Sequence, residues 1–186
     1  MTQTTPLHGI GHNSGRDMTG YTGRLHQWRR ARGALVGKTL PIEVIRTRVR
    51  RATALGLDFG TYASLREASG RDIVALLFSS GAVGMLRRAE LDAHAARRLA
   101  RVEAELGVMV HAPVPVEAPH PLDWAARAPA FTDRWGVMRD TLREALQARR
   151  LPPSAVLMVG ATAVEREWCA AARAAGWVPA ERYFAA

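Results

Sequence analysis

Three short, uninterrupted runs of apolar residues constrain the fold of this chain most strongly. They cover residues 73–78 (IVALLF), 108–110 (VMV, with His111 ending the same predicted strand) and 155–159 (AVLMV). Runs of this length without polar alternation are typical of parallel strands that are buried on both faces. They alternate with stretches of helical periodicity, and a strand–helix–strand succession predicts an α/β fold. We therefore expect a small parallel sheet of three or four strands with flanking helices.

The helical stretches have recognisable ends. They cover residues 84–106, 131–150 and 162–175. Gly107 and Gly176 suit the positions just after a helix, where a left-handed backbone is common. Pro152 and Pro153 would break the second helix, because proline lacks the backbone N–H that a helix interior needs. The tail at 177–184 is the candidate for a fourth, edge strand.

A basic helical segment is expected to precede the sheet. Helical spacing indicates helices at residues 21–36, 41–55 and 60–68, with Asp58 as an N-cap of the last. These helices fit a helix-turn-helix-like module and fit equally well a helical cap over a sheet. Residues 1–20 are rich in Gly and small polar residues and predict a disordered arm. The expected organisation is an arm at 1–20, a basic helical segment at 21–69 and an α/β domain at 70–186.

Positive charge is concentrated in the first third of the chain. Residues 1–57 carry ten Arg or Lys against Asp17 and Glu43, whereas residues 58–186 carry sixteen Arg against fifteen acids. A local field of this kind attracts polyanions, and arginine with interleaved aromatic residues suits nucleic acid. The charges along residues 87–105 alternate in sign, as on the solvated face of a helix. This mixed charge argues against a basic surface that extends into that region. The expected phosphate contacts are Arg24, Arg29, Arg30, Arg32, Arg46, Arg48, Arg50 and Arg51, with Trp28 as a stacking residue.

A second candidate site follows two of the predicted strands. Ser79, Ser80 and Gly81 follow the first strand, and Gly160 and Thr162 follow the third. Ligands of open parallel sheets bind beyond the carboxyl ends of strands, where helix N-termini present N–H groups to anions. These residues could hold a phosphorylated ligand. Ser, Gly and Thr are also ordinary helix caps and turn residues, and that alternative stays open.

Residues 151–177, which read LPPSAVLMVGATAVE and end in Ala-Ala-Gly-Trp, resemble the last strand–helix unit of haloacid dehalogenase-like proteins. The resemblance implies a metal-binding Asp where this chain has Ala161. It also implies an Asp-x-Asp pair near Phe78–Ser80, where no carboxylate occurs. Without these acids there is neither a nucleophile nor a magnesium site. The resemblance therefore implies a degenerate, non-catalytic relative.

Other features narrow the class of protein. A single cysteine, Cys169, suggests a reducing, cytoplasmic setting. The sequence contains no run of about eighteen apolar residues, so no membrane span is predicted. His8 and His12 lack a third ligand, and His94 and His111 have no evident catalytic partner, so no metal or cofactor is expected. The leading hypothesis is a non-enzymatic, nucleic-acid-associated regulatory or accessory protein. The alternatives are a small α/β protein that binds a phosphorylated ligand and an adaptor that docks on an acidic protein.

Overall fold

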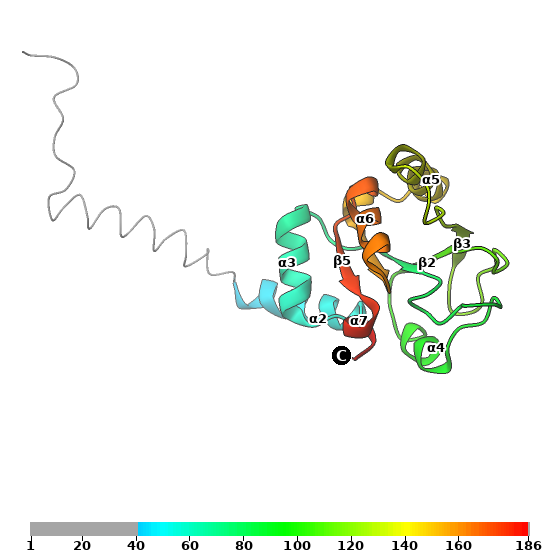
Figure 1. Cartoon of the computed structure of the whole chain (residues 1–186). Coiled ribbons are helices and arrows are strands. Elements are labelled where there is room, and N and C mark those ends of the chain that lie inside the picture. The colour runs from blue at the N-terminus through cyan, green and yellow to red at the C-terminus, as the bar shows by residue number, and fades with distance from the viewer. Residues whose placement is uncertain (1–40, 186) are drawn as a thin grey trace, which may run out of the picture. The chain divides into compact units, whose positions relative to one another are not determined.

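The computed structural model describes residues 41–185, which form a five-stranded sheet flanked by helices on both faces (Figure 1). Its strands are β1 (Ala75–Ser79), β2 (Glu105–Val110), β3 (Trp124–Arg127), β4 (Val156–Gly160) and β5 (Gly176–Pro179). The spatial order is β3-β2-β1-β4-β5, and every neighbouring pair is parallel. The α/β class is thus confirmed, with one strand more than the expected maximum. The additional strand is β3, whose sequence WAAR is half alanine and lacks the apolar run that marks the others.

Helices cover both faces of this sheet. They are α2 (Ile42–Ala54), α3 (Phe59–Ser69), α4 (Ala93–Leu99), α5 (Trp135–Ala148), α6 (Ala163–Ala172) and α7 (Ala180–Ala185), with a 3-10 turn at Pro153–Ala155. Helices α5 and α6 share one hydrophobic cluster with the sheet, whereas α2, α3, α4 and α7 contribute to the other. Figure 1 shows α5 and α6 on the opposite side of the sheet from α4 and α7.

Alternation along each strand divides the core between the two faces. In β1, Leu76 and Phe78 belong to one cluster and Leu77 to the other. All five β1 residues are buried, as a central strand covered on both faces requires. Phe78 is fully buried and packs edge-on against Tyr183 of α7, with ring centroids 5.5 Å apart. Burial of each such side chain contributes about 1.5–3 kcal/mol to folding.

Helices α2 and α3 pack onto the sheet as a helical cap. Ala52, Leu55 and Tyr62 join the cluster that contains Phe78. Asp58 caps α3 as expected, because its carboxylate accepts a hydrogen bond of 2.8 Å from the N–H of Thr61. Gly56, between the two helices, has a φ of +67°, a conformation that favours glycine. The predicted helix at 21–36 and the predicted arm lie outside the described residues.

The long helix expected at 84–106 is wrong. The structure has only the seven-residue α4 there, and turns occupy most of residues 80–92. Gly84 adopts a φ of +77°, which interrupts a helix, and Asp92 starts α4 by accepting hydrogen bonds from the N–H groups of His94 and Ala95. Residues 100–104 connect α4 to β2. Periodicity alone could not detect these interruptions, because the alternating charges look helical throughout.

Gly107 does not end a helix, as expected from the sequence, but lies inside β2. It pairs in register with Trp124 of β3, whose indole ring covers its Cα. A Cβ at this position would overlap the ring atoms Cε2 and Cζ2 of Trp124. Glycine is therefore required by close approach of a neighbouring side chain rather than by helix termination.

The remaining helices match the expectations closely. Helix α5 buries Met138, Leu142 and Leu146 at intervals of four residues, which places them on one face. Helix α6 begins after Thr162 but ends at Ala172, so Gly176 lies in β5 and not directly after a helix, contrary to expectation. β5 occupies the start of the predicted edge strand, and α7 forms the remainder. Within residues 41–185, no helix has both the length and the apolar composition needed to cross a membrane.

Candidate functional site

The arginines of α2 diverge onto different sides of the helix. Arg24, Arg29, Arg30, Arg32 and Trp28 lie outside the described residues, so the structure places Arg46, Arg48, Arg50 and Arg51 of the predicted set. Arg51 turns inward, and its Nη1 and Nη2 donate to the backbone carbonyls of Glu103 (3.0 Å) and Ile73 (2.7 Å). Its Nε also lies 3.3 Å from Asp72 Oδ2. This guanidinium therefore links α2 to the segments that precede β1 and β2.

The other three α2 arginines are closer to solvent. Arg48 lines a hollow of mixed charge that also contains Glu43, Arg66 and Asp72. Arg46 forms an exposed ion pair with Glu43 at 2.7 Å. Arg50 is exposed and lies three residues before Thr53, so the two occupy the same side of α2. A second group of arginines gathers next to Thr53.

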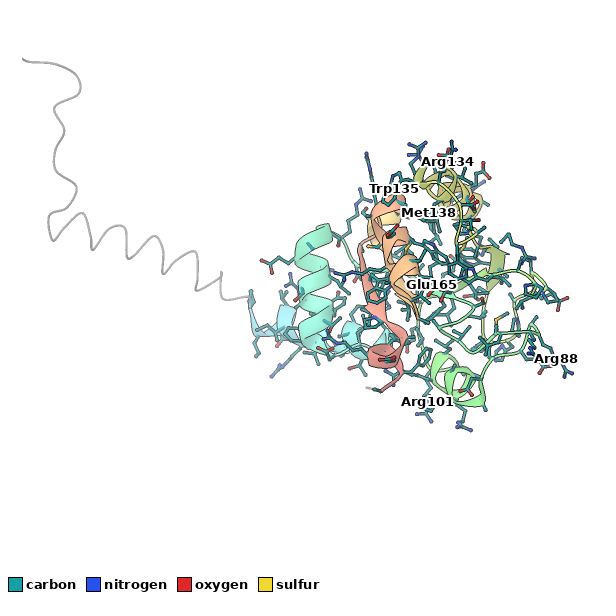
Figure 2. The ribbon with its side chains drawn as sticks, viewed as in Figure 1. Arg88, Arg101, Arg134, Trp135, Met138 and Glu165 are labelled. Carbon is teal, nitrogen blue, oxygen red and sulfur yellow. The ribbon has the colours of Figure 1, made fainter. Side chains whose placement is uncertain are left out.

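That group forms a cleft between the end of α2 and α4, here called the cationic cleft. It has a volume of about 350 Å³ and is within the range of small ligand sites. Its lining residues are Thr53, Gly56, His94, Arg97, Arg98, Arg101 and Val102. Three arginines and a histidine therefore line it, with no acidic side chain among the described lining residues. Figure 2 shows Arg101 at the periphery of the molecule beside α4.

The cleft contradicts the expectation that the basic surface does not extend beyond the first third of the chain. In a continuous helix the acids at 90–105 would be interleaved with the arginines. In the structure, Asp92 is the N-cap of α4. Glu105 is the first residue of β2, and its Oε1 lies 2.9 Å from Nε of Arg149. Arg97 and Arg101 consequently stay exposed beside α2. Glu90 and Glu103 are exposed but are not among the lining residues of the cleft.

Arg98 anchors the cleft floor. Its Nη2 donates to the carbonyl of Gly56 at 2.9 Å, and its guanidinium carbon lies 5.2 Å from the ring centroid of Tyr183. Tyr183 in turn donates its hydroxyl to the carbonyl of Leu55 at 3.0 Å. Burial raises the pKa of Tyr183 to about 12, so this donor keeps its proton at all ordinary pH values. These contacts hold α2, α4 and α7 together around the cleft.

The second candidate site, at the carboxyl ends of β1 and β4, is assembled but internally occupied. Ser79 and Ser80 are 1% and 2% exposed. The Oγ of Ser79 accepts a hydrogen bond from the N–H of Ala82 at 3.2 Å, and that of Ser80 accepts one from the N–H of His111 at 3.2 Å. Gly81 lies beside Ala161, so the two turns do meet. Both hydroxyl oxygens therefore accept hydrogen bonds from the backbone of the protein itself.

The carboxylate of Glu165 occupies the position where an anion would bind at the start of α6. Its Oε2 accepts hydrogen bonds from the N–H groups of Ala161 (2.7 Å) and Thr162 (2.9 Å). Thr162 returns the interaction by accepting from the N–H of Glu165, which completes a capping box. The predicted ligand residues Gly160 and Thr162 thus adjoin an N-terminus at which the N–H groups of Ala161, Thr162 and Glu165 are already bonded.

Glu165 also reaches across the sheet to His111. Its Oε1 lies 2.9 Å from Nε2 of His111, the residue that follows β2. Burial by itself would raise the pKa of Glu165, but hydrogen bonds from His111, Ala161, Thr162 and Ser79 outweigh it and leave this pKa below its ordinary value. Glu165 is 2% exposed and ionised at neutral pH. Figure 2 shows it beside α6, near the middle of the described part of the chain.

His111 is the residue that sequence reasoning missed. No catalytic partner was evident for it, because Glu165 lies 54 residues away and reaches it only through the pairing of β2 and β4 with β1. Its ring stacks on Phe131, with centroids 4.4 Å apart and planes at 17°, and lies 5.4 Å from the ring of Trp168. The Thr162-x-x-Glu165 spacing of a capping box was a readable signal for the role of Glu165.

Metal-ligating side chains do not gather within residues 41–185, where no group of three or more His, Cys, Asp or Glu could hold an ion. The resemblance of residues 151–177 to haloacid dehalogenase-like proteins falls on β4 and α6, and it stays a prediction. Ala161 follows β4 with only a methyl side chain, and the nearest acid, Glu165, is used to cap α6. No protein-family model, curated protein or solved structure matches this chain.

Proposed function

We propose that this protein binds nucleic acid, and that the cationic cleft supplies phosphate contacts. The observation that carries the proposal is the gathering of Arg97, Arg98 and Arg101 with His94 in a cleft whose described lining contains no acid. Arginine presents a planar fork of donors that matches phosphate oxygens, and neutralised phosphates release counterions. The proposed role is binding without catalysis, as in an accessory or regulatory protein.

Arg50 extends the proposed contact surface along α2. It shares a helix side with Thr53, which lines the cleft, and its side chain is exposed. Arg51 is a weaker candidate, because a guanidinium that already donates to two carbonyls and adjoins Asp72 has little capacity for phosphate. Arg48 lies among acids as well as arginines. The proposal therefore shifts the phosphate contacts from the whole of α2 toward its Arg50–Thr53 side and α4.

The alternative of a phosphorylated ligand at Ser79–Gly81 and Gly160–Thr162 has less support. A phosphate there would have to displace the carboxylate of Glu165 from the N–H groups of Ala161 and Thr162. It would also approach a buried negative charge, which repels it. The cationic cleft presents the opposite electrostatics, so the geometry favours a polyanion at the cleft.

The double variant R97Q/R101Q tests the proposal. We expect it to lower the affinity for a labelled oligonucleotide at least tenfold at low salt. The slope of log K against log salt should also fall in magnitude by about 1.8, since each phosphate contact contributes about 0.9. Fluorescence anisotropy with single- and double-stranded DNA and RNA over a salt series measures both quantities.

R134Q/R143Q is the matched control, because it removes the same charge from exposed residues at and near α5. It should change the affinity less than twofold. Equal losses in the two double variants would reduce the effect to net charge and refute a specific cleft. Displacement of the oligonucleotide by polyglutamate at equal charge concentration would favour an acidic protein as the partner.

A further inference from the structure

A second cavity lies at the carboxyl ends of β2 and β3, on the side of the sheet covered by α5. Its volume is about 410 Å³, large enough for a small molecule. Its lining includes His111, Arg127, Pro129, Phe131, Asp133 and Thr141. Ligand sites of open parallel sheets lie beyond the carboxyl ends of the strands. The cavity lies beyond strand carboxyl ends as this rule requires, whereas the point at which the strand order reverses is between β1 and β4.

His111 presents an unoccupied acceptor in this cavity. An ionised carboxylate can only accept hydrogen bonds, so Nε2 of His111, 2.9 Å from Glu165 Oε1, must carry the proton. In the neutral form of the ring, the lone pair is then on Nδ1. This atom makes no hydrogen bond within residues 41–185, and it is not among the buried polar atoms that lack a partner. It is therefore accessible, and it is suited to accept a proton donor of a ligand.

The cavity wall favours a flat ring. Phe131 stacks on His111 and is 57% exposed, so part of its ring surface is open to a ligand. Pro129 and three alanines supply further apolar surface. Flat apolar surfaces next to a small number of directed polar groups are typical of sites for heterocyclic ligands.

The charges around the cavity favour an uncharged ligand. Arg127 donates through Nη1 to the carbonyls of Val110 (3.2 Å) and Val114 (3.0 Å), which ties it to the cavity rim. Asp133 accepts a hydrogen bond from the N–H of Ala130 at 2.7 Å. One cation and one anion line the space, and the carboxylate of Glu165 lies behind His111. A phosphate group would meet both carboxylates, so it is disfavoured.

We propose that this cavity binds an uncharged, planar heterocycle that donates an N–H to Nδ1 of His111, and that nucleosides are the ligand class. The base would pack on the apolar wall, while Asp133 and Thr141 are positioned on the cavity wall to bond hydroxyl or amino groups. The inference does not depend on nucleic-acid binding, because it uses none of the residues of the cationic cleft. Glu165 acts here as a positioning residue that sets the tautomer of His111.

Ligand binding is tested with the full chain and four probes, namely adenosine, guanosine, cytidine and uridine. At a concentration about a hundredfold above Kd, a bound nucleoside should raise the melting temperature by about 5 °C or more. Isothermal titration calorimetry then gives the affinity. A change of less than about 0.5 °C with all four probes at their solubility limits would overturn the proposal.

The variant H111F retains a ring of similar size but removes the acceptor, and it should weaken nucleoside binding by about ten- to a hundredfold. H120F is the matched control, because His120 is exposed in the loop before β3 and lines neither this cavity nor the cationic cleft. It should leave nucleoside affinity unchanged. Unaltered binding by H111F would refute the acceptor role of His111.

Two further measurements keep the proposal testable even where H111F does not fold. F131A removes an exposed stacking surface, so it should fold normally and weaken binding about tenfold. Nitrogen-15 NMR of the wild-type imidazole should show a proton on Nε2 and none on Nδ1, with the Nδ1 signal shifting when nucleoside is added. A proton on Nδ1 of the unliganded protein, or full affinity in F131A, would contradict the proposed site.

Discussion

Replacing Glu165 with alanine is expected to lower the free energy of unfolding by about 3–5 kcal/mol, one of the two largest effects of any single substitution considered. The carboxylate satisfies the N–H groups of Ala161 and Thr162 and the Nε2–H of His111. Its removal leaves these donors unsatisfied in a site that is closed to most solvent, and each such group costs about 1–3 kcal/mol. Urea denaturation monitored by circular dichroism measures the loss.

Glu167 provides the control on the same helix. It is exposed and two residues away from Glu165, on another side of α6. E167A should change the free energy of unfolding by no more than about 0.5 kcal/mol. Similar losses in the two variants would mean that α6 responds to any lost charge, and that the contacts of Glu165 are not the cause.

The same residue should make stability depend on pH. Because the folded state holds the pKa of Glu165 below its ordinary value of 4.5, the unfolded state binds more protons between these two values. The contribution of Glu165 is therefore complete above about pH 4.5 and is lost as the pH falls through the folded-state pKa. E165Q should lack this component, so the wild-type advantage over E165Q should shrink on acidification. An advantage that does not change from pH 7 to pH 3 would contradict the depressed pKa.

Replacing Gly107 with alanine is expected to be the second large effect, a loss of about 3 kcal/mol. The new methyl group would overlap the indole ring of Trp124, which is buried between β3 and the helical layer of α5 and α6. A buried strand pair has little freedom to separate, and overpacking of this kind costs about 1–3 kcal/mol, occasionally more. Thermal and urea denaturation of G107A should both show the loss.

Gly136 is the matched control for this substitution. It lies in the first turn of α5, and a Cβ there would meet no atom within 4 Å. G136A should raise stability by about 0.5–1 kcal/mol, since alanine has the higher helix propensity and restricts the unfolded chain. The opposite signs of the two glycine-to-alanine changes separate steric overlap from backbone entropy. A neutral G107A would show that the Trp124 ring can move aside.

Local patterns were sufficient where the determinants are close in sequence. The apolar runs marked β1 and β4, because a central parallel strand must be apolar on both faces. Asp58 marked the start of α3 through a hydrogen bond that spans three residues. The same reasoning was insufficient for residues 84–106, where the charge alternation of a helix coincides with a loop, a single short helix and the start of β2.

For the candidate sites, sequence reasoning located one of the two but predicted neither its hydrogen bonding nor the existence of the other. The turns after β1 and β4 could be recognised from composition, and parallel pairing does bring them together. The sequence did not reveal that the N–H groups of these turns are already bonded, because the hydrogen bonds to Glu165 form only when α6 is in place. The cationic cleft could not be predicted either, since the two acids Asp92 and Glu105, which flank its cationic residues in the sequence, cap α4 and pair with Arg149.

The amino-acid sequence alone determined the α/β class, the central strands, most of the helices and the excess of positive charge, because these depend on composition and on contacts between near neighbours. The tertiary structure alone decided that β3 pairs at the edge, that Gly107 lies beneath Trp124 and that His111 meets Glu165. Each of these relations joins residues brought together by strand order, and the geometry of a folded sheet sets such contacts rather than spacing along the chain.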